Sequence, residues 1–308
     1  MSAFIDEHRA RFGVEPITEI LGVSASAYYQ RQTGERCARE LDDERLLALI
    51  KVTQAKNYFA YGYRRTWKAL RRGGEFAPRC QVQRLMAAHG IQGAKRRGRP
   101  WRTTIADPQA RRRVDLVARQ FSASGPDRLW VADFTYLYCW EGVAYFAFVL
   151  DVFSRMIVGW QLAATMRTTL VLDALRMALA LRAPGADVAL VCHSDAGSQY
   201  TSEDYTQVLD DHDVLASIGS VGDAYDNALA ESFVDSYKTE LIADRVWRSR
   251  AQLQLETAHW VGWFNRERLH GSLGDIPPVE FEALRVAATL QQHDTHNSLP
   301  LLSAQAAS

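Results

Sequence analysis

Three acidic residues occupy positions where the sequence pattern predicts strand or helix boundaries. Asp133 lies in "WVADFT", a run that alternates apolar and polar residues as a strand does, and Asp195 follows "ADVALVCHS", a short apolar run of strand type. Glu231 lies in the first turns of a predicted helix, "ALAESFVDSYKTELI", and 35 residues separate it from Asp195. A carboxylate beside a core is costly unless it binds a cation or a hydrogen-bond donor.

Acids on two adjacent strands and one facing helix can converge on a single site. Hard divalent cations prefer oxygen ligands, and a pair of magnesium ions needs carboxylates that it can share. Such a pair activates a water or hydroxyl group and stabilises the leaving oxygen in phosphodiester chemistry. Asp133, Asp195 and Glu231 are therefore the candidates for a catalytic site that converges on such a magnesium pair.

A lysine follows the third acid at helical spacing. Lys238 is seven residues after Glu231, which places the two residues on the same helix face two turns apart. A cation at that point can hold a DNA phosphate beside the metal site. The alternative is a surface lysine that pairs with Asp235 or Glu231.

Polar neighbours of the acids are candidates for supporting roles. His193 either contacts the site or packs at the end of the strand that precedes Asp195. Asp226 and Asn227 are predicted to cap the Glu231 helix, since Asp and Asn are favoured at that position. A cap would fix the direction in which Glu231 points.

The elements that must position these residues divide the chain into a helical half and a mixed half. Before residue 126 the pattern predicts helices over 14–33 (as helix, turn, helix), 41–56, 62–72 and 78–90. After it, three consecutive strands predict an antiparallel meander, and a helix then leads to a strand parallel to an earlier one. The fold class expected is α/β, a mixed sheet flanked by helices and preceded by an all-α region.

The net charge of zero hides opposite charges on the two halves. Residues 1–125 hold 24 Lys and Arg against 12 Asp and Glu, and residues 126–308 hold 12 against 24. A dense basic segment interleaved with aromatic residues favours nucleic acid as a partner of the first half. The residues expected to contact DNA there are Arg64, Arg65, Arg71, Arg72 and Arg84 in the helices, and Lys95, Arg96, Arg97 and Arg99 in a basic extended arm.

The cysteines and the apolar runs exclude several classes. The four cysteines show no paired spacing, which argues against a structural zinc site or a disulfide scaffold and fits a reducing cytoplasm. No signal peptide is visible at the N-terminus, and no run approaches the roughly 18 apolar residues of a membrane helix.

Several longer stretches resemble a known family. "WVADFTY", "FVLDVFSRMIVGW", "HSDAGSQYTS" and "SIGSVGDAYDNALAESFVDSYKTELI" are similar to the insertion sequence three family of transposases, relatives of the retroviral integrases. The N-terminal "YGYRRTWKALRRGGEFAPRCQVQRLMAAHGI" and the late "FNRERLHGSLGDIPPVEF" fit the product of that family's downstream reading frame. The resemblance covers about residues 1–285.

The resemblance implies a ribonuclease-H-like catalytic fold, magnesium or manganese at Asp133, Asp195 and Glu231, and Lys238 as a contact to the transposon end. It also implies cleavage of the element ends, strand transfer by a homo-multimer on DNA, an upstream-frame protein as a possible fusion partner, and a bacterial, nucleoid-associated location. No zinc is expected, because the His/Cys module of retroviral integrases has no counterpart here. The boundaries expected are 1–40 (helix-turn-helix-like), 41–98 (basic helical DNA-binding), 99–125 (basic linker), 126–286 (integrase-type core) and 287–308 (disordered tail).

Two other functions are consistent with the same residues. A nuclease of the same fold would share the three acids and cut DNA without joining it. A non-catalytic DNA-binding regulator of transposition would bind the element ends without cutting them. Such a regulator could also be a transposase that has lost its activity, but the presence of all three acids argues against an inactivated enzyme.

Overall fold

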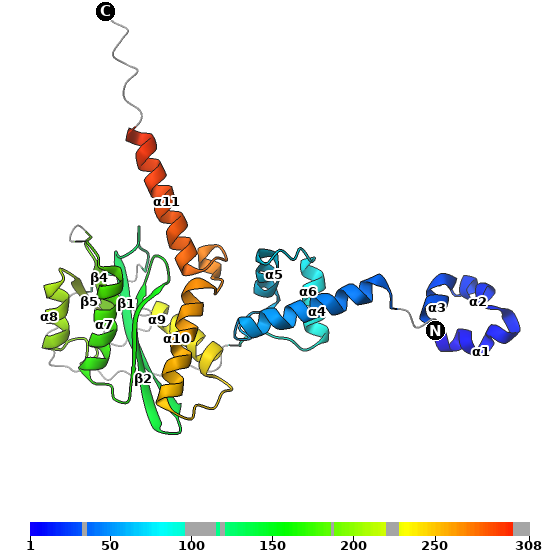
Figure 1. Ribbon diagram of the computed structural model, residues 1–308, viewed down its shortest axis with the longest axis horizontal. Helices are drawn as coiled ribbons and strands as arrows, with labels where there is room; N and C mark the ends of the chain where they lie inside the picture. The colour runs from blue at the N-terminus through cyan, green and yellow to red at the C-terminus, as the bar shows by residue number, and fades with distance from the viewer. Residues whose placement is uncertain (33–35, 96–114, 118–120, 186–187, 220–227, 298–308) are drawn as a thin grey trace, which may run out of the picture. The chain divides into compact units, whose positions relative to one another are not determined.

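The computed structural model describes residues 1–32, 36–95, 115–117, 121–185, 188–219 and 228–297. The chain divides into two compact units, Met1–Gly93 and Ala94–Ser308 (Figure 1). The described part of the first unit is helical. Its helices are α1 (Ser2–Phe12), α2 (Val14–Ile20), α3 (Ala25–Gln32), α4 (Ala38–Lys56), α5 (Tyr63–Arg72) and α6 (Arg79–Ala88).

Two small cores organise these helices. One joins α1, α2 and α3 around Ile5, Ile17 and Tyr28, and the turn between α2 and α3 passes through Gly22 at a positive φ of 65°. The other joins α4, α5 and α6 through the buried residues Leu46, Ile50, Leu70, Ala77, Val82, Leu85 and Met86. The predicted helices 41–56, 62–72 and 78–90 correspond to α4, α5 and α6.

A five-stranded mixed sheet forms the centre of the second unit. Its strands are β1 (Leu129–Cys139), β2 (Gly142–Asp151), β3 (Ile157–Ala163), β4 (Val191–Ser194) and β5 (Leu215–Ile218). Their order in the sheet is β3-β2-β1-β4-β5. The first three strands pair antiparallel, and β4 pairs parallel with both β1 and β5. The predicted meander and the predicted parallel strand are therefore confirmed.

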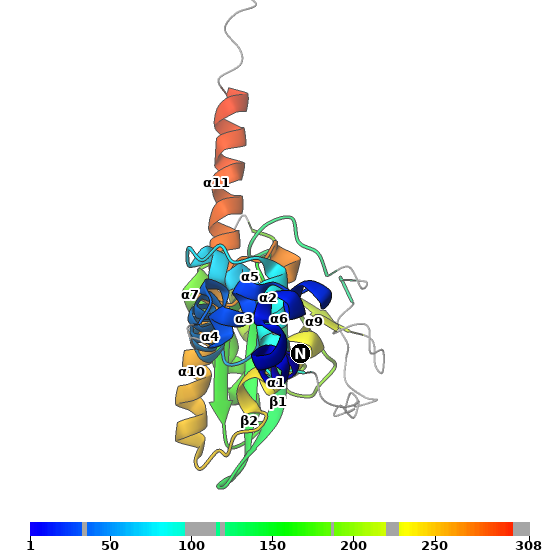
Figure 2. The same cartoon turned by 90° about the vertical axis from the view of Figure 1, so that its right-hand side faces the viewer.

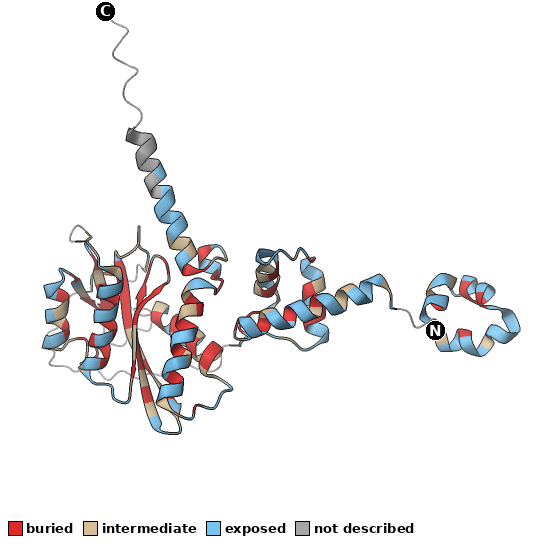
Figure 3. Cartoon of the chain, viewed as in Figure 1, coloured by how far each residue is buried: buried red, intermediate tan, exposed pale blue. Residues whose placement is uncertain are grey.

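Helices cover both faces of this sheet (Figures 1 and 2). They are α7 (Thr168–Arg182), α8 (Glu203–Asp211), α9 (Ala228–Tyr237), which continues as the π-helix η1 (Lys238–Ile242), and α10 (Arg250–Arg266). Residues of α7 and α8 share one apolar core with Trp130, Ala132 and Val149 on the first face. Figure 3 shows the buried residues concentrated on the strands and on the helix surfaces that turn toward them.

Aromatic packing holds α9 and α10 on the second face. Phe233 of α9 lies 4.3 Å from Phe148 between ring centroids, and Tyr237 stacks on Phe146 at 4.5 Å. The Tyr237 hydroxyl shares a hydrogen bond of 2.7 Å with Thr257 of α10. Trp260, Trp263 and Phe264 of α10 are buried, as their helical spacing predicts. These contacts fix the helix that carries Glu231.

The approach of α7 to β3 is close enough to require a glycine. A Cβ atom on Gly159 would lie 2.1 Å from the carbonyl oxygen of Ala174 and 2.8 Å from the backbone nitrogen of Ala178. Both are backbone atoms of α7, so no side-chain rotation can make room. Gly159 thus lets the helix lie directly on the sheet.

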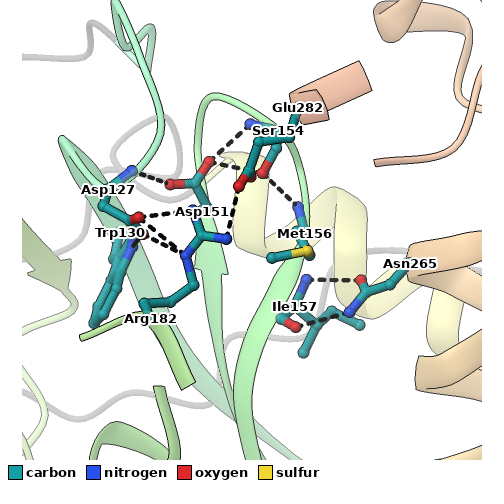
Figure 4. A network of polar contacts seen from close by, with 9 residues as sticks. All are labelled: Asp127, Trp130, Asp151, Ser154, Met156, Ile157, Arg182, Asn265 and Glu282. Carbon is teal, nitrogen blue, oxygen red and sulfur yellow. Dashed lines mark hydrogen bonds and ion pairs between the residues drawn. The ribbon is translucent and has the colours of Figure 1, made fainter. Parts of the chain in front are cut away.

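A network of charged residues joins three distant segments of the second unit (Figure 4). Arg182, at the end of α7, donates to both carboxylate oxygens of Asp127 and pairs with Glu282 at 2.7 Å. The Asp127 backbone nitrogen donates to the buried carboxylate of Asp151, which also accepts from Ser154. Burial raises the pKa of Asp151, and its hydrogen-bond donors oppose that shift.

The last helices differ from the expectation for the end of the chain. The 3₁₀ turn η2 (Gly271–Leu273) leads to α11 (Pro278–Asn297), and residues 287–297 are helical where a disordered tail from 287 was expected. The physical reason is composition: "LRVAATLQQ" consists mainly of good helix formers and contains neither Gly nor Pro. In Figures 1 and 2, α11 projects from the body that contains the sheet. No helix in the described ranges is long and apolar enough to cross a membrane.

Candidate active site

The register of two parallel strands brings the first two acids together. In the β1–β4 pair, Val131 is opposite His193 and Ala132 is opposite Ser194. One step further along the same register, Asp133 comes beside Asp195, which directly follows β4. Asp133 is also opposite Phe148 on β2, so it lies on the face of the sheet that carries α9.

Asp133 lies in an environment that disfavours its charge. Burial and the negative charge of Asp195 raise the pKa of Asp133 to about 8, although part of the residue reaches solvent. The Phe134 backbone nitrogen donates a hydrogen bond of 2.8 Å to Asp133 and opposes the shift, as does the charge of Lys238. Glu231 adds to it. The site therefore concentrates negative charge around one enclosed carboxyl group.

Asp195 is oriented by the tight turn that follows it. Its Oδ1 accepts a hydrogen bond of 3.0 Å from the backbone nitrogen of Gly197. A Cβ atom on Gly197 would lie 2.9 Å from that same oxygen, so a side chain at this position would displace the carboxylate. The turn beside the acids therefore requires glycine at position 197 for a steric reason.

Glu231 lies in the first turn of α9 and is exposed. Partial burial and the charge of Asp235, one turn later, raise its pKa. Across the described part of the chain, no three His, Cys, Asp or Glu side chains lie close enough together to hold one metal ion. The structure thus pairs Asp133 with Asp195 and leaves Glu231 nearby without gathering all three around a common point.

The donor set fits a divalent metal in its chemistry. The three side chains are carboxylates, which magnesium and manganese prefer. A cation among them would offset the burial and the repulsion by Asp195 that together raise the pKa of Asp133 to about 8. The fit is therefore good in donor type and charge. Joint ligation by all three requires the acids to draw closer than they lie here.

Lys238 begins the π-helical segment that continues α9. Its ammonium lies 5.0 Å from the ring centroid of Tyr136, three positions after Asp133 on β1. Burial lowers the pKa of Lys238, and the charges of Asp235 and Asp133 act against that shift. The charges of Lys238 and Asp133 therefore act on each other. Tyr136 escaped sequence analysis, although the aromatic alternation of "WVADFTYLYCW" carried the signal.

Of the polar neighbours of the acids, His193 lies within the part of the chain that the structure describes. His193 is buried, and its Nδ1 lies 3.0 Å from the Ser217 hydroxyl and 3.8 Å from Asp115 Oδ1. Its ring packs edge to face against Phe121. These contacts attach the segment that precedes β1 to the sheet. Asp226 and Asn227 lie outside the described residues.

The basic residues of the first unit gather on α5. Arg64 and Arg71 are seven residues apart and so share a face, as do Arg65 and Arg72. The guanidinium of Arg71 lies 5.1 Å from the ring centroid of Trp67. The four arginines are exposed except Arg65, which is half-buried.

The other basic residues expected at DNA have different surroundings. Arg84 of α6 donates to both carboxylate oxygens of Asp43 at 2.6 and 2.7 Å, so its charge has a partner within the helical module. Lys95 is exposed at the end of a described range. Arg96, Arg97 and Arg99 lie outside the described residues, as does most of the linker 99–125.

Comparison with known families gives matches over most of the chain. Residues 123–224 and 212–278 match models described as integrase core domain. Residues 40–99 match a model described as HTH-like domain. That description falls on the segment expected to be the basic helical DNA-binding domain rather than on residues 1–40.

Curated relatives agree with these matches. The chain is 45% identical over 287 residues to the transposase for insertion sequence element IS629 from Shigella sonnei, over 92% of this chain and 95% of that one. It is 31% identical over 291 residues to transposase InsF for insertion sequence IS3A from Escherichia coli K12, over 92% and 99%. The HTLV-2 integrase catalytic core domain, solved in complex with magnesium, aligns at 12% identity and a TM-score of 0.40, over 52% of this chain and 99% of that one.

The two insertion-sequence transposases match the chain through both its helical unit and its mixed sheet, at identities that establish common descent. The chain belongs to the insertion sequence three family of transposases, DDE-type polynucleotidyl transferases in which an integrase catalytic core follows an HTH-like domain.

Proposed function

We propose that Asp133, Asp195 and Glu231 are the catalytic acids of this transposase and bind two Mg²⁺ or Mn²⁺ ions. The observation that carries the proposal is the adjacency of Asp133 on β1 and Asp195 directly after β4, with the charge of Asp195 acting on Asp133. Bound metal would supply Lewis-acid stabilisation of the oxygens that attack and leave phosphorus. It would also supply the attraction that draws Glu231 toward the pair.

The reaction proposed has two steps on DNA. Water first cuts one strand at each element end, and the 3′-hydroxyl released there then attacks another phosphodiester and displaces the 3′-oxygen of the strand it joins. In this chain, the contribution of β1 and β4 is to hold two carboxylates at fixed spacing, because both strands are buried in the sheet. The hydrogen bond from Gly197 keeps the carboxylate of Asp195 in one orientation through both steps.

Positive side chains would position the DNA. Lys238 stands over Tyr136, close enough to Asp133 to shift its pKa, and it would hold a phosphate of the transposon end. Arg64, Arg65, Arg71 and Arg72 of α5 would contact the phosphate backbone. The basic residues Arg84, Lys95, Arg96, Arg97 and Arg99 are proposed to add contacts further along.

The supporting residues and partners belong to the same proposal. His193 would act indirectly, through the strand β4 that precedes Asp195. Asp226 and Asn227 are proposed as caps of α9. Two element ends must be held together, so a homo-multimer on DNA in the bacterial nucleoid is proposed, with the upstream-frame protein of the element as a further partner.

The experiment is a coupled cleavage and strand-transfer assay on the full chain. A labelled terminal duplex and a supercoiled target plasmid are incubated with Mg²⁺, and cut and joined products are separated on a denaturing gel. Asp133→Asn, Asp195→Asn and Glu231→Gln should each lose both products by at least a hundredfold. Asp235→Asn is the matched control, since it removes a carboxylate one turn from Glu231 on the same helix and should retain activity.

The other possible outcomes distinguish the transposase from the two rival functions. Strand transfer by Asp195→Asn at the wild-type rate would refute the metal site. Cut ends without joined product would favour the nuclease. Binding of ends without cutting, by the chain alone and by its fusion to the upstream-frame protein, would favour the regulator.

A further inference from the structure

A strip of aromatic residues, half-buried at Tyr136 and exposed at Tyr138 and Trp140, runs along the β1–β2 hairpin. Tyr136 and Tyr138 occupy alternate positions of β1, so their side chains project to one side of the strand, and Trp140 follows in the turn. Tyr138 is 69% exposed and Trp140 is 72% exposed. The rings of Tyr136 and Tyr138 meet edge to face, with centroids 5.7 Å apart. A contiguous exposed strip of this kind marks a contact surface rather than part of the core.

Cations flank the strip at both ends. The ammonium of Lys238 lies 5.0 Å from the Tyr136 centroid, and the guanidinium of Arg248 lies 5.8 Å from the Trp140 centroid. Both distances are within the range of cation–π attraction. We call the five residues Tyr136, Tyr138, Trp140, Lys238 and Arg248 the hairpin platform.

The platform is held rigidly although its rings are exposed. The backbone nitrogen of Trp140 donates a hydrogen bond of 2.9 Å to the carbonyl oxygen of Trp247. Arg250 donates through Nη1 to the carbonyl oxygen of Glu141 at 2.8 Å and through its backbone nitrogen to the Glu141 carboxylate at 3.0 Å. The hairpin turn is thereby fixed to the segment that begins α10, so ligand binding would order little backbone.

The residues around the platform carry a net charge of opposite sign to that of the whole segment 126–308. Residues 126–308 carry 12 Lys and Arg against 24 Asp and Glu. Four of those basic residues fall within 238–250, namely Lys238, Arg245, Arg248 and Arg250. Of the nearby acids, Glu240 is buried in an ion pair with Arg268 and Glu141 pairs with Arg250, so Lys238, Arg245 and Arg248 outnumber Asp244. The surface is therefore locally basic and suits a polyanion.

We infer that the hairpin platform binds unpaired bases of single-stranded DNA at the element end, an inference that rests on the proposed function. Exposed aromatic rings stack on unpaired bases, whereas in a paired duplex both faces of each base are covered by its neighbours. Lys238 and Arg248 contact the phosphates between the stacked bases. Tyr136 is three residues beyond Asp133 on β1, about 10 Å along the strand. This odd spacing places the two side chains on opposite faces of β1, and Lys238 connects them: its ammonium lies at the Tyr136 ring and its charge acts on Asp133, so the platform adjoins the catalytic acids at Lys238.

Binding to two probes tests the inference. Fluorescence anisotropy is measured on the full chain in EDTA with a fully paired terminal duplex and with the same duplex whose last three pairs are mismatched. Trp140→Ala should weaken binding to the mismatched probe roughly tenfold and to the paired probe less than twofold. Arg248→Gln should weaken binding to the mismatched probe and lower the salt slope by about one. Leu181→Ala, an exposed apolar control on α7, should change neither affinity.

Three results would overturn the inference. They are equal losses by Trp140→Ala on both probes, no loss on either, or a change of oligomeric state in sedimentation with both affinities intact, which would assign the strip to a protein interface. As a direct readout, 5-iododeoxyuridine at the mismatched positions should photocrosslink to the peptide that contains Tyr138 and Trp140. Binding in EDTA needs no catalysis, so this test is independent of the proposed metal site. If Asp195→Asn failed to abolish strand transfer, the binding experiment would still show whether the hairpin platform contacts unpaired bases.

Discussion

Replacing Arg182 by methionine would remove the cation on which two nearly buried carboxylates depend. Arg182 donates to Asp127 at 2.8, 3.0 and 2.6 Å and pairs with Glu282 at 2.7 Å (Figure 4). The side chains of Arg182, Asp127 and Glu282 are only 13%, 14% and 15% exposed. Burial alone would lower the pKa of Arg182, but the hydrogen bonds to Asp127 and Glu282 outweigh it and raise that pKa.

The expected loss of stability follows from the unpaired charge that would remain. Asp127 keeps one side-chain donor, the Trp130 indole nitrogen at 3.0 Å. The Oε2 atom of Glu282 is already buried and accepts no hydrogen bond from the described residues. Breaking a buried ion pair by removing one partner costs about 3–5 kcal/mol. For a unit of this size the melting temperature should fall by about 6–20 °C.

The assay is chemical denaturation of the full chain at pH 7.5, followed by tryptophan fluorescence, with thermal melts in parallel. Arg176→Ala is the matched control: it lies on the same helix, pairs with Asp173 at 3.7 Å and is 60% exposed, so its loss should stay below about 0.5 kcal/mol. Arg182→Lys keeps the charge without the planar fork and should fall between the two. A loss below about 1 kcal/mol at pH 7.5 for Arg182→Met would refute the reasoning that the network is held by paired buried charge.

Three further predictions concern single positions in the second unit. Asp133→Asn, measured in EDTA, should stabilise the folded protein by about 1–4 kcal/mol at pH 7 and should have no effect at pH 3. The pKa of Asp133 is about 8 in the folded protein and 3.8 in the unfolded chain, so its carboxyl group costs stability as the pH rises above 3.8. Equal stability of the two proteins at pH 7 would contradict this prediction. Gly159→Ala should cost more than about 2 kcal/mol in urea denaturation, since its methyl group meets the backbone of α7, whereas Gly262→Ala, with open space around it in α10, should be neutral or stabilising. Cys192, whose pKa burial raises to about 11, should resist iodoacetamide at pH 8 under conditions that modify exposed Cys80, as mass spectrometry of the native protein would reveal.

The pairing of the two aspartates could be predicted because each step follows from short-range pattern. The alternation of "WVADFT" and the apolar run "ADVALVC" predict strands, and the intervening helix makes the second strand parallel to an earlier one. Carboxyl ends of parallel strands share an edge of the sheet, so Asp195 had to emerge near β1. The observed register of β1 and β4 agrees with this.

The position of Glu231 relative to that pair could not be derived in the same way. Helical periodicity identifies Phe233 and Tyr237 as the buried face of α9, but not the rings against which they pack. Those rings belong to Phe146 and Phe148, more than 80 residues earlier in the chain. The distance between the acids therefore depends on tertiary packing, which local patterns do not encode.

Charged side chains were the least predictable feature. Arg84 lies outside the apolar face of its helix, and nothing in the sequence indicates that the packing of α6 on α4 places it against Asp43, 41 residues away. Arg182 and Asp127 are 55 residues apart and give no sign of their pairing in the sequence. Ion-pair partners are selected by the final fold, so spacing along the chain carries little information about them.

The most direct test of the central claim is anomalous diffraction from crystals of the protein soaked in manganese. The account predicts manganese peaks within coordination distance of the carboxylate oxygens of Asp133 and Asp195, with Glu231 completing the site, and loss of these peaks in Asp195→Asn. Manganese bound elsewhere, or no peak beside Asp133 and Asp195 at millimolar concentration, would contradict the proposal that these acids form the metal site.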